Sequence, residues 1–480
     1  MSAPPATADI LLRGGTVITV DPARRVIADG AVAIAADRIL AVGPRADIEA
    51  AYTARQVIDT THHAILPGLI DGHAHAGHGL VKTLHGGDSA AWSEACRVIY
   101  TTASTPEFWH AEARLAALER LMFGVTTGVS LLGGGDSILR TDDLAHGIAH
   151  CRGVTEIGIR DIVAVGPTRP PHPRVYASWE GGVRHEYPVS FERQLETIEA
   201  LIETCHGRGR IGVATLMPVY AEAEHDPVAV ALIARQGRLV RDLGRKHGLI
   251  FHQDGHHSGS LDMADRMFGL LGPDATMSHS TDLTDADIEA AARHGASIVH
   301  NPSAIASVRG YCPVPRLLDR GVNVMLGSDG TAPDRSTDMF RHMFQCMRLH
   351  QRQHRDERLM PPGKLLEMVT IDAARGLNIA HEVGSLEAGK KADIITVDLR
   401  KPHLYPLNMP VWRVVCFANG QDVDTVIVDG RILMRARAVA HVDTNEILDA
   451  AQAETGLMLD RAGLRAALAE PPTLWGKARH

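Results

Sequence analysis

The 480-residue chain lacks several features that would assign it to a familiar class of protein. No uninterrupted apolar segment approaches the roughly 20 residues of a membrane-spanning helix. Residues 1–9 have neither the basic head nor the apolar core of a signal peptide. The net charge of −8 includes no long basic run, which argues against binding to nucleic acid or to anionic membranes. We therefore expect a cytoplasmic protein with no nucleic-acid or membrane partner.

Cysteine is also scarce, and the six cysteines include no Cys-x-x-Cys pair. This scatter argues against a disulfide framework and against a zinc–thiolate site. The content of 45% hydrophobic and 22% charged residues is instead that of a soluble globular enzyme.

Residues 65–75 (Ile-Leu-Pro-Gly-Leu-Ile-Asp-Gly-His-Ala-His) are the most informative stretch that is present. They form an apolar run that ends in His73 and His75, and on a β-strand this spacing places both rings on one face. Two such imidazoles suit a divalent metal whose other ligands come from elsewhere in the chain. A chance pair is the alternative, because the chain contains 27 histidines.

The middle of the chain alternates between strand-like and helical patterns. Residues 108–122 repeat apolar side chains at steps of three and four, and Thr105 before Pro106 predicts the start of that helix. Eight such alternations over about 310 residues predict an α/β fold of the (β/α)8 TIM-barrel type. A doubly wound sheet is the alternative, although no Gly-x-Gly-x-x-Gly follows an early strand. The predicted strands are near residues 65–75, 124–132, 158–166, 211–219, 249–254, 276–281, 296–302 and 323–330.

Short strands separated by turn residues occupy both ends of the chain. They predict a small β-sandwich domain built from the two ends. The expected division is residues 1–64 and 384–445 for the sandwich, 65–383 for the barrel and 446–480 for a helical tail.

Four predicted strands in succession end in a histidine or an aspartate. These residues are His252, His279, His300 and Asp329. Because barrel active sites lie at the carboxyl ends of the strands, this succession indicates a site there.

Residues 65–75 resemble the first-strand signature of the amidohydrolase superfamily, and residues 384–393 resemble a late motif of the same superfamily. The resemblance implies that one divalent metal, with Zn²⁺ as first choice and Fe²⁺ or Mn²⁺ as alternatives, is bound by His73, His75, His252 and Asp329. It also implies that Asp329 accepts a proton from the attacking water and that His279 donates to the developing oxyanion. A homo-oligomer is a further expectation from the superfamily.

The absence of a lysine from the predicted fourth strand distinguishes between two branches of that superfamily. Members with two metals generally bridge them through a carboxylated lysine on the fourth strand, but residues 211–219 contain none. The chain therefore resembles the mononuclear branch that includes the S-adenosylhomocysteine and guanine deaminases and the triazine hydrolases of the atrazine type. The resemblance is carried by residues 121–127 and 300–303.

One position departs from this branch. The deaminases usually carry His-x-x-Glu after the fifth strand, whereas Gly255 occupies the position of the Glu. This removes a general acid typically worth about 10²–10⁴-fold in rate, and Asp254 and His256 are the candidate replacements as proton shuttle. Sulfide and chloride leave more easily than ammonia, so the missing Glu favours reactions that release one of these two groups.

The sequence thus predicts a metal-dependent hydrolase that attacks an sp² carbon of a small heterocycle, with a hydrolytic deaminase ranked first. Hydrolytic displacement of sulfur or halide, a cyclic amide hydrolase of the imidazolonepropionase type and a non-catalytic scaffold are the alternatives. An arginine in the site could bind a substrate carboxylate. The predicted substrate-binding residues are His78, His85, Trp92, Arg169 and His300.

Overall fold

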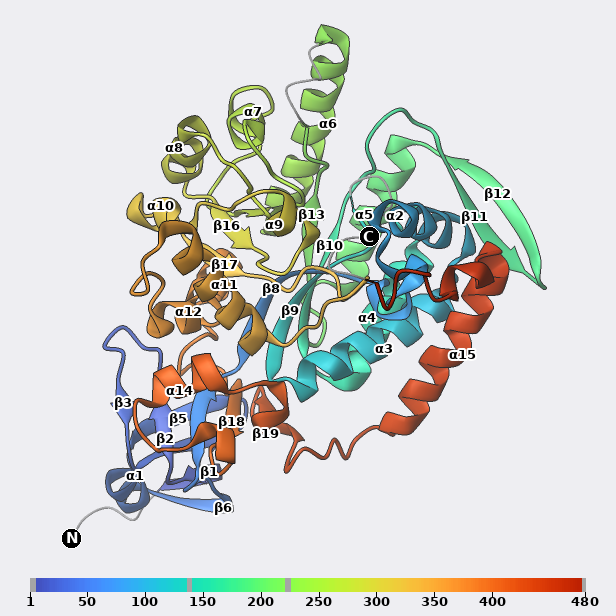
Figure 1. Cartoon of the computed structure of the whole chain (residues 1–480). Helices are drawn as coiled ribbons and strands as arrows, with labels where there is room; N and C mark the ends of the chain where they lie inside the picture. Colours follow the sequence, from blue (N-terminus) through green and yellow to red (C-terminus); the bar gives the residue numbers. More distant parts are fainter. Residues whose placement is uncertain (1–5, 136–139, 221–225, 477–480) are drawn as a thin grey trace.

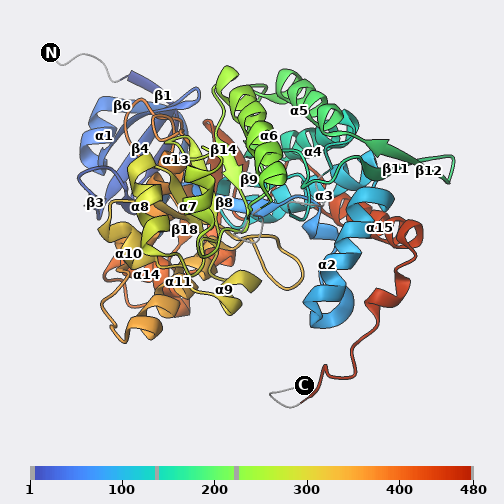
Figure 2. The same cartoon turned by 90° about the horizontal axis from the view of Figure 1, so that it is seen from above.

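The computed structural model describes residues 6–135, 140–220 and 226–476. Its largest sheet has eight strands that follow one another in chain order, and every neighbouring pair is parallel. All eight strands lie where they were predicted, so the (β/α)8 barrel is confirmed (Figures 1 and 2). The strands are β8 (Leu69–His75), β9 (Val125–Leu131), β10 (Arg160–Val165), β13 (Ile211–Leu216), β14 (Phe251–Gln253), β15 (Ala275–Ser278), β16 (Ser297–His300) and β17 (Val324–Leu326).

Helices lie between most of these strands and cover the outside of the sheet. The predicted helix starts are confirmed in detail. The side chain of Thr105 accepts a hydrogen bond from the backbone of Phe108, and Thr284 and Asp287 form a reciprocal capping box. The helices of this part of the chain are α2 (Ser89–Val98), α3 (Pro106–Met122), α4 (Leu144–Ile157), α5 (Phe191–Cys205), α6 (Pro227–Lys246), α7 (Ser260–Arg266), α8 (Asp285–His294), α9 (Ile305–Arg309), α10 (Val314–Asp319), α11 (Met339–His354), α12 (Pro362–Met368) and α13 (Ile371–Gly376).

Polar contacts join the last strand of the barrel to the first. The backbone N–H of Asp329 donates to the carbonyl of His73 (2.9 Å). The backbone N–H and the hydroxyl of Ser328 donate to the two carboxylate oxygens of Asp71 (2.8 and 2.7 Å). These bonds bring the carboxyl ends of β8 and β17 together.

Two further sheets combine the ends of the chain. One contains β1 (Ala6–Arg13), β4 (Gly30–Ala35), β5 (Arg38–Pro44) and β6 (Tyr52–Asp59). The other contains β2 (Thr16–Ile18), β3 (Val26–Ile27), β7 (His63–Pro67), β18 (Ile394–Asp398), β19 (Val423–Val428) and β20 (Arg431–Met434). Buried side chains of both sheets form one apolar cluster, and α1 (Arg45–Ala51) and α14 (Pro410–Phe417) flank them. The division of the chain at residues 64, 383 and 445 stays a prediction.

The run predicted over residues 65–75 is two strands, and this is a correction. The backbone N–H of Gly68 donates to Asp393 of the small sheet, whereas that of Leu69 donates to Gly124 of the barrel. The chain therefore passes from one sheet to the other between these two residues.

Two other segments adjoin the barrel. The Pro-rich stretch after β10 leads into the antiparallel hairpin of β11 (Arg174–Glu180) and β12 (Val183–Val189). Near the end of the chain, α15 (Thr444–Ala462) lies beside α3, to which the Arg114–Glu446 ion pair ties it (Figure 1). The expected tail extends to residue 480, and its last four residues lie outside the described part.

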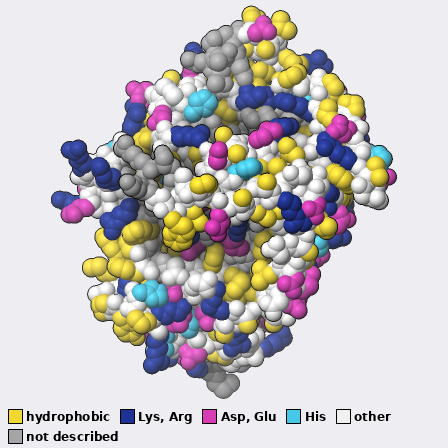
Figure 3. Space-filling view, turned by 45° about the vertical axis from the view of Figure 1, so that its right-hand side comes forward, with side chains coloured by type: hydrophobic (Ala, Val, Ile, Leu, Met, Phe, Trp, Pro, Cys, Tyr) yellow, Lys and Arg dark blue, Asp and Glu magenta, His cyan; other side chains and the backbone are white. Residues whose placement is uncertain are grey.

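No helix among the described residues is both long and apolar enough to span a membrane. On the face seen in Figure 3, basic and acidic side chains are interspersed. That distribution agrees with the absence of a long basic run in the sequence.

A buried cation lies beneath the carboxyl ends of the first strands. Arg120 extends from α3 and reaches Asp71 on β8 (3.3 Å) and Asp161 on β10 (3.2 Å). It also donates to the hydroxyl of Ser130 on β9 (2.8 Å). Both carboxylates are fully buried, so the guanidinium group balances charges that water does not reach.

We predict that Arg120→Met lowers the free energy of unfolding by about 3–5 kcal/mol, because Asp71 and Asp161 would stay buried without their cation. Urea denaturation followed by circular dichroism measures the change. Arg97→Ala is the control, since Arg97 pairs with Glu94 on the surface and its removal should change stability by less than about 1 kcal/mol. If the two substitutions lowered the free energy of unfolding equally, the buried ion pairs of Arg120 would not contribute to stability.

Candidate metal centre

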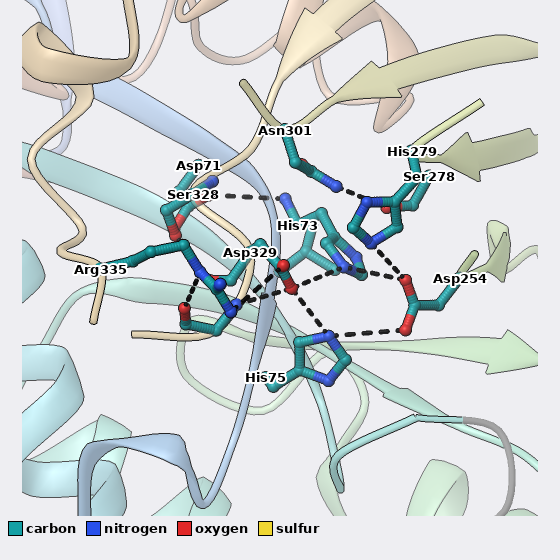
Figure 4. Close-up of polar contacts among 12 residues, drawn as sticks. Asp71, His73, His75, Asp254, Ser278, His279, Asn301, Ser328, Asp329 and Arg335 are labelled. Atoms are coloured by element: carbon teal, nitrogen blue, oxygen red, sulfur yellow. Dashed lines mark hydrogen bonds and ion pairs between the residues drawn. The ribbon is translucent and has the colours of Figure 1, made fainter. Parts of the chain in front are cut away.

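Histidines and carboxylates from four strand ends converge at the mouth of the barrel (Figure 4). His75 Nε2 lies 3.1 Å from Asp329 Oδ1. Oδ1 of Asp254 lies 3.2 Å from His73 Nε2 and 3.0 Å from His279 Nε2. Asp329 follows β17, Asp254 follows β14 and His279 follows β15, so parallel strands deliver these groups to the same end of the barrel.

Hydrogen bonds orient the two histidines of β8. Nδ1 of His75 bonds to the carbonyl of Gly133 (2.8 Å), which requires the proton on Nδ1 and leaves a lone pair on Nε2. Nδ1 of His73 lies 2.8 Å from Nε2 of His252, and Nδ1 of His252 lies 2.6 Å from the hydroxyl of Thr276. Partners of this kind behind an imidazole are typical of histidines that bind metals.

Two carboxylates, Asp329 buried and Asp254 mostly buried, give the site a negative charge. Burial alone would raise the pKa of Asp254, but His73 and His75 hold it well below its ordinary value. Burial likewise opposes the charged form of Asp329, yet contacts with His73, His75 and Arg335 hold its pKa well below the usual range. In return, the carboxylates overcome the effect of burial on His73 and raise its pKa to about 9.

These residues fit a divalent cation. His73 Nε2 and Asp254 Oδ1 are buried and make ionic contact, but neither has a hydrogen-bond partner among the described residues. His73, His75 and Asp329 each offer an atom within 4.8 Å of the others, and so do His73, Asp254 and His279. Imidazole nitrogen and carboxylate oxygen are ligands that Zn²⁺ and related ions accept.

Backbone strain accompanies the same residues. His279 has φ 66° and Asp329 has φ 59°, both in the left-handed region that side chains other than glycine seldom adopt. Strained conformations of this kind persist where the surrounding structure enforces them and are concentrated at functional sites.

The structure ranks the two candidate replacements for the missing Glu. Asp254 enters the group of converging atoms, whereas the ring of His256 bonds to Ser260 (2.9 Å). Burial and His257 lower the pKa of His256 to about 3, so the ring is neutral. Gly255 has φ 98°, a conformation that disfavours any side chain at that position. The conformation of the loop therefore directs the side chain of Asp254 toward His73 and His279.

His252, predicted as a metal ligand, is buried at the site, but its Nε2 faces Nδ1 of His73 rather than the carboxylates. Its assignment as a ligand stays a prediction.

The predicted substrate-binding residues lie in different places. His78 stacks on His75 (centroids 4.7 Å apart) and meets Trp92 edge-on (5.1 Å), and both side chains are buried. Gly330 leaves room for His78, because a Cβ there would lie 1.5 Å from the ring. His85 is half-buried in the same loop.

The other two predicted substrate-binding residues come from later strands: Arg169 follows β10, and His300 is the last residue of β16. Arg169 lies over the ring of Tyr220 (4.6 Å), at the edge of a cavity of about 610 Å³ that Pro170 and His172 also line. His300 packs against His350 on α11 (5.2 Å between centroids). The substrate contacts of all five residues stay predictions.

Sequence reasoning missed Arg335, whose guanidinium lies 3.4 Å from Asp329 Oδ2. Its hydrogen bonds to the carbonyls of Gly330 and Ala332 hold it in place. It also missed the role of Asp71, although that residue belongs to the quoted motif. No sequence pattern predicts that Arg335, in the loop after the last strand, contacts the carboxylate of Asp329.

Comparison with known proteins places the chain among its relatives. The profile of the amidohydrolase family matches residues 235–433, and that of the bacterial imidazolonepropionase-like composite domain matches residues 30–54. The 5-methylthioadenosine/S-adenosylhomocysteine deaminase of Syntrophobacter fumaroxidans is 31% identical over 464 residues, which cover 92% of this chain and 96% of that protein. The chain belongs to the amidohydrolase family. It is a hydrolase, and the resemblance inferred from the sequence is confirmed.

Other similar proteins agree. The 5'-deoxyadenosine deaminase of Methanosarcina mazei is 29% identical over 93% of this chain and 97% of its own. The crystal structure of an adenosine deaminase from Xanthomonas campestris with bound zinc covers 95% of this chain and 100% of its own, with a TM-score of 0.80 and 22% identity. The atrazine chlorohydrolase from Arthrobacter aurescens, complexed with zinc, covers 93% of this chain and 100% of its own, with a TM-score of 0.77 and 21% identity. These two structures support the barrel fold.

We predict that His75→Ala removes one molar equivalent of metal from the purified protein, because His75 is one of the predicted ligands. Elemental analysis of the dialysed protein measures the loss. His85→Ala is the matched control, since His85 lies in the loop that follows and should leave the metal content unchanged. Full metal content in the His75→Ala protein would exclude this histidine as a ligand.

Proposed function

We propose that this hydrolase is a hydrolytic deaminase, which releases ammonia from an sp² carbon of a small heterocycle. The observation that carries the proposal is the convergence of two carboxylates and three histidines in one group at the mouth of the barrel. These residues are His73, His75, His279, Asp254 and Asp329. Relatives that match nearly the whole chain are named as deaminases of adenosine derivatives. An adenosine-type nucleoside is therefore the first substrate to test.

One divalent cation belongs to this proposal, with zinc as first choice. His73, His75 and Asp329 would hold it, and His252 is the further predicted ligand. When bound, such an ion supplies Lewis-acid chemistry that lowers the pKa of water toward about 7.

The side chains account for the protons of the reaction. Water adds its oxygen to the amino-bearing carbon, and the carboxylate of Asp329 accepts one of its protons. Nε2 of His279, held 3.0 Å from Asp254, donates to the oxygen as charge develops there. The proton taken by Asp329 passes to the ring nitrogen that gained the electron pair of the C=N bond. The remaining hydroxyl proton passes through Asp254 to the amino group, the C–N bond breaks, ammonia leaves and a carbonyl remains on the ring.

Asp254 is the acid that we propose in place of the missing Glu. It is a carboxylate in the resting structure because His73 and His75 keep its pKa low, so it can first take a proton. It then delivers that proton to the departing nitrogen, which the poor leaving group requires. Its contact with His279 places both proton carriers side by side.

The other readings of the sequence predict different products. Displacement of sulfur or halide would release sulfide or chloride and would depend less on an acid. A cyclic amide hydrolase would open the ring, and a non-catalytic scaffold would release nothing. A homo-oligomer and a substrate with a carboxylate bound by Arg169 stay predictions.

We predict that Asp254→Asn lowers kcat for an aminated heterocycle by about 10²–10⁴-fold, because the amide cannot carry a proton to the leaving nitrogen. The same substitution should slow a chlorinated analogue much less. Ammonia and chloride release are measured in parallel, with metal content as a check of the site. His257→Ala is the control, because this exposed histidine of the same loop should leave both rates unchanged. An equal loss on both substrates would contradict the role as an acid.

Asp329→Ala should abolish turnover while the protein keeps its circular dichroism spectrum. The unsubstituted enzyme is assayed beside it on aminated, thiolated and halogenated heterocycles. Ammonia as the main product supports the deaminase. Release of sulfide or chloride would replace that proposal with the displacement reaction. If the metal centre is intact but no product forms, the result would favour the scaffold.

A further inference from the structure

A second group of metal-binding side chains lies between the barrel and helix α11. It consists of His300 at the end of β16 and of Cys346 and His350 on α11. All three side chains are completely buried, and each offers a ligand atom within 4.8 Å of the others. Cys346 and His350 are four residues apart, so they share one face of the helix. His300 faces them from the strand.

Three of the four ring nitrogens in this group have no hydrogen-bond partner among the described residues. Both ring nitrogens of His300 and Nε2 of His350 are buried and have no hydrogen-bond partner among the described residues. Most buried polar atoms in folded proteins have one, because an unsatisfied buried group destabilises the fold. Three unsatisfied buried nitrogens in one group indicate that a ligand binds there.

Tyr311 supports a definite orientation of His350. Its hydroxyl lies 2.7 Å from His350 Nδ1 and 2.8 Å from His354 Nε2. If the hydroxyl donates to His354, it accepts the Nδ1 proton of His350, and the Nε2 lone pair then points toward the cluster. A partner behind the ring is the arrangement that orients metal-binding histidines elsewhere.

The neighbouring histidine shows the contrast. His342 is also buried on α11, but its two nitrogens lie 3.2 Å from the hydroxyl of Ser303 and 2.7 Å from the carbonyl of Ser336. Burial on this helix does not by itself leave an imidazole unsatisfied. Among the described histidines of β16 and α11, only His300 and His350, next to Cys346, have buried ring nitrogens without a partner.

We propose that His300, Cys346 and His350 form a second cation site that binds Zn²⁺. A thiolate with two imidazoles suits this ion, whereas Mg²⁺, Ca²⁺ and Mn²⁺ prefer oxygen ligands. The bound ion takes the place of the thiol proton of Cys346, which is released. It joins β16 to α11 directly before Asn301, whose amide donates to Ser278 beside His279. The proposed ion is structural, and as its ligand His300 would not contact the substrate, so this proposal replaces the substrate-binding role predicted for that residue.

Cobalt substitution tests this proposal on the full-length protein. The metal is removed with a chelator and replaced with Co²⁺, and the absorption spectrum is recorded. Thiolate bound to Co²⁺ gives a charge-transfer band in the near ultraviolet. The candidate metal centre at the barrel mouth contains no cysteine among its described residues, so the band reports only on the second site. We expect the band and two equivalents of metal per chain.

Substitution then assigns the band. Cys346→Ser should abolish the band and remove one equivalent of metal, while the catalytic rate stays within about twofold. Cys96→Ser, which changes another completely buried cysteine on α2, should keep both. A cobalt-loaded protein without the band, or a band that survives in Cys346→Ser, would overturn the proposal.

The unsubstituted protein gives the first answer, so the test does not depend on how well a variant folds. Loss of the band with full deaminase activity separates this proposal from the function of the barrel mouth. Absence of any activity would leave the cobalt result intact.

Discussion

The contacts between the last and first strands of the barrel are the constraint on which the candidate site depends. Ser328 bonds to both oxygens of Asp71, and the backbone of Asp329 bonds to the carbonyl of His73. The first and last contributors to the site are thereby held at one point, although the whole barrel separates them in the chain. Asp71 is itself held by Arg120, so a helix, three strands and the site share one buried network.

The loop after β14 departs from the family pattern at one position. The glutamate position is occupied by Gly255, whose left-handed backbone favours the absence of a side chain. The residue before it, Asp254, reaches the same group of atoms with a shorter side chain. Within the proposed mechanism, a change of loop conformation compensates for the loss of the longer acid.

Most of the fold and the centre of the site could be predicted because both follow from local patterns. Alternating apolar runs and capping residues predict the strands and the starts of helices, and His73, His75, His279 and Asp329 are recognisable at strand ends. The orientation of His252 behind His73 could not be predicted, because it depends on the rotation of two rings. Arg335 and Arg120 were missed because their partners come from distant parts of the chain. The cysteine pattern argued against a zinc–thiolate site, yet a single cysteine and two histidines from separate elements leave no spacing signal, and the proposed second site is of that kind.

The pairing of β7 with β18 has a consequence for the order in which the protein is made. β7 runs directly into the strand that carries His73 and His75. One of its two neighbours in the sheet, β2, precedes it in the chain, but the other, β18, follows the whole barrel. During translation one edge of β7 therefore stays unpaired until β18 has been made. Pairing between such distant segments slows folding and exposes that edge to other chains. The strand that carries His73 and His75 therefore begins beside a sheet that is complete only after β18 has joined it.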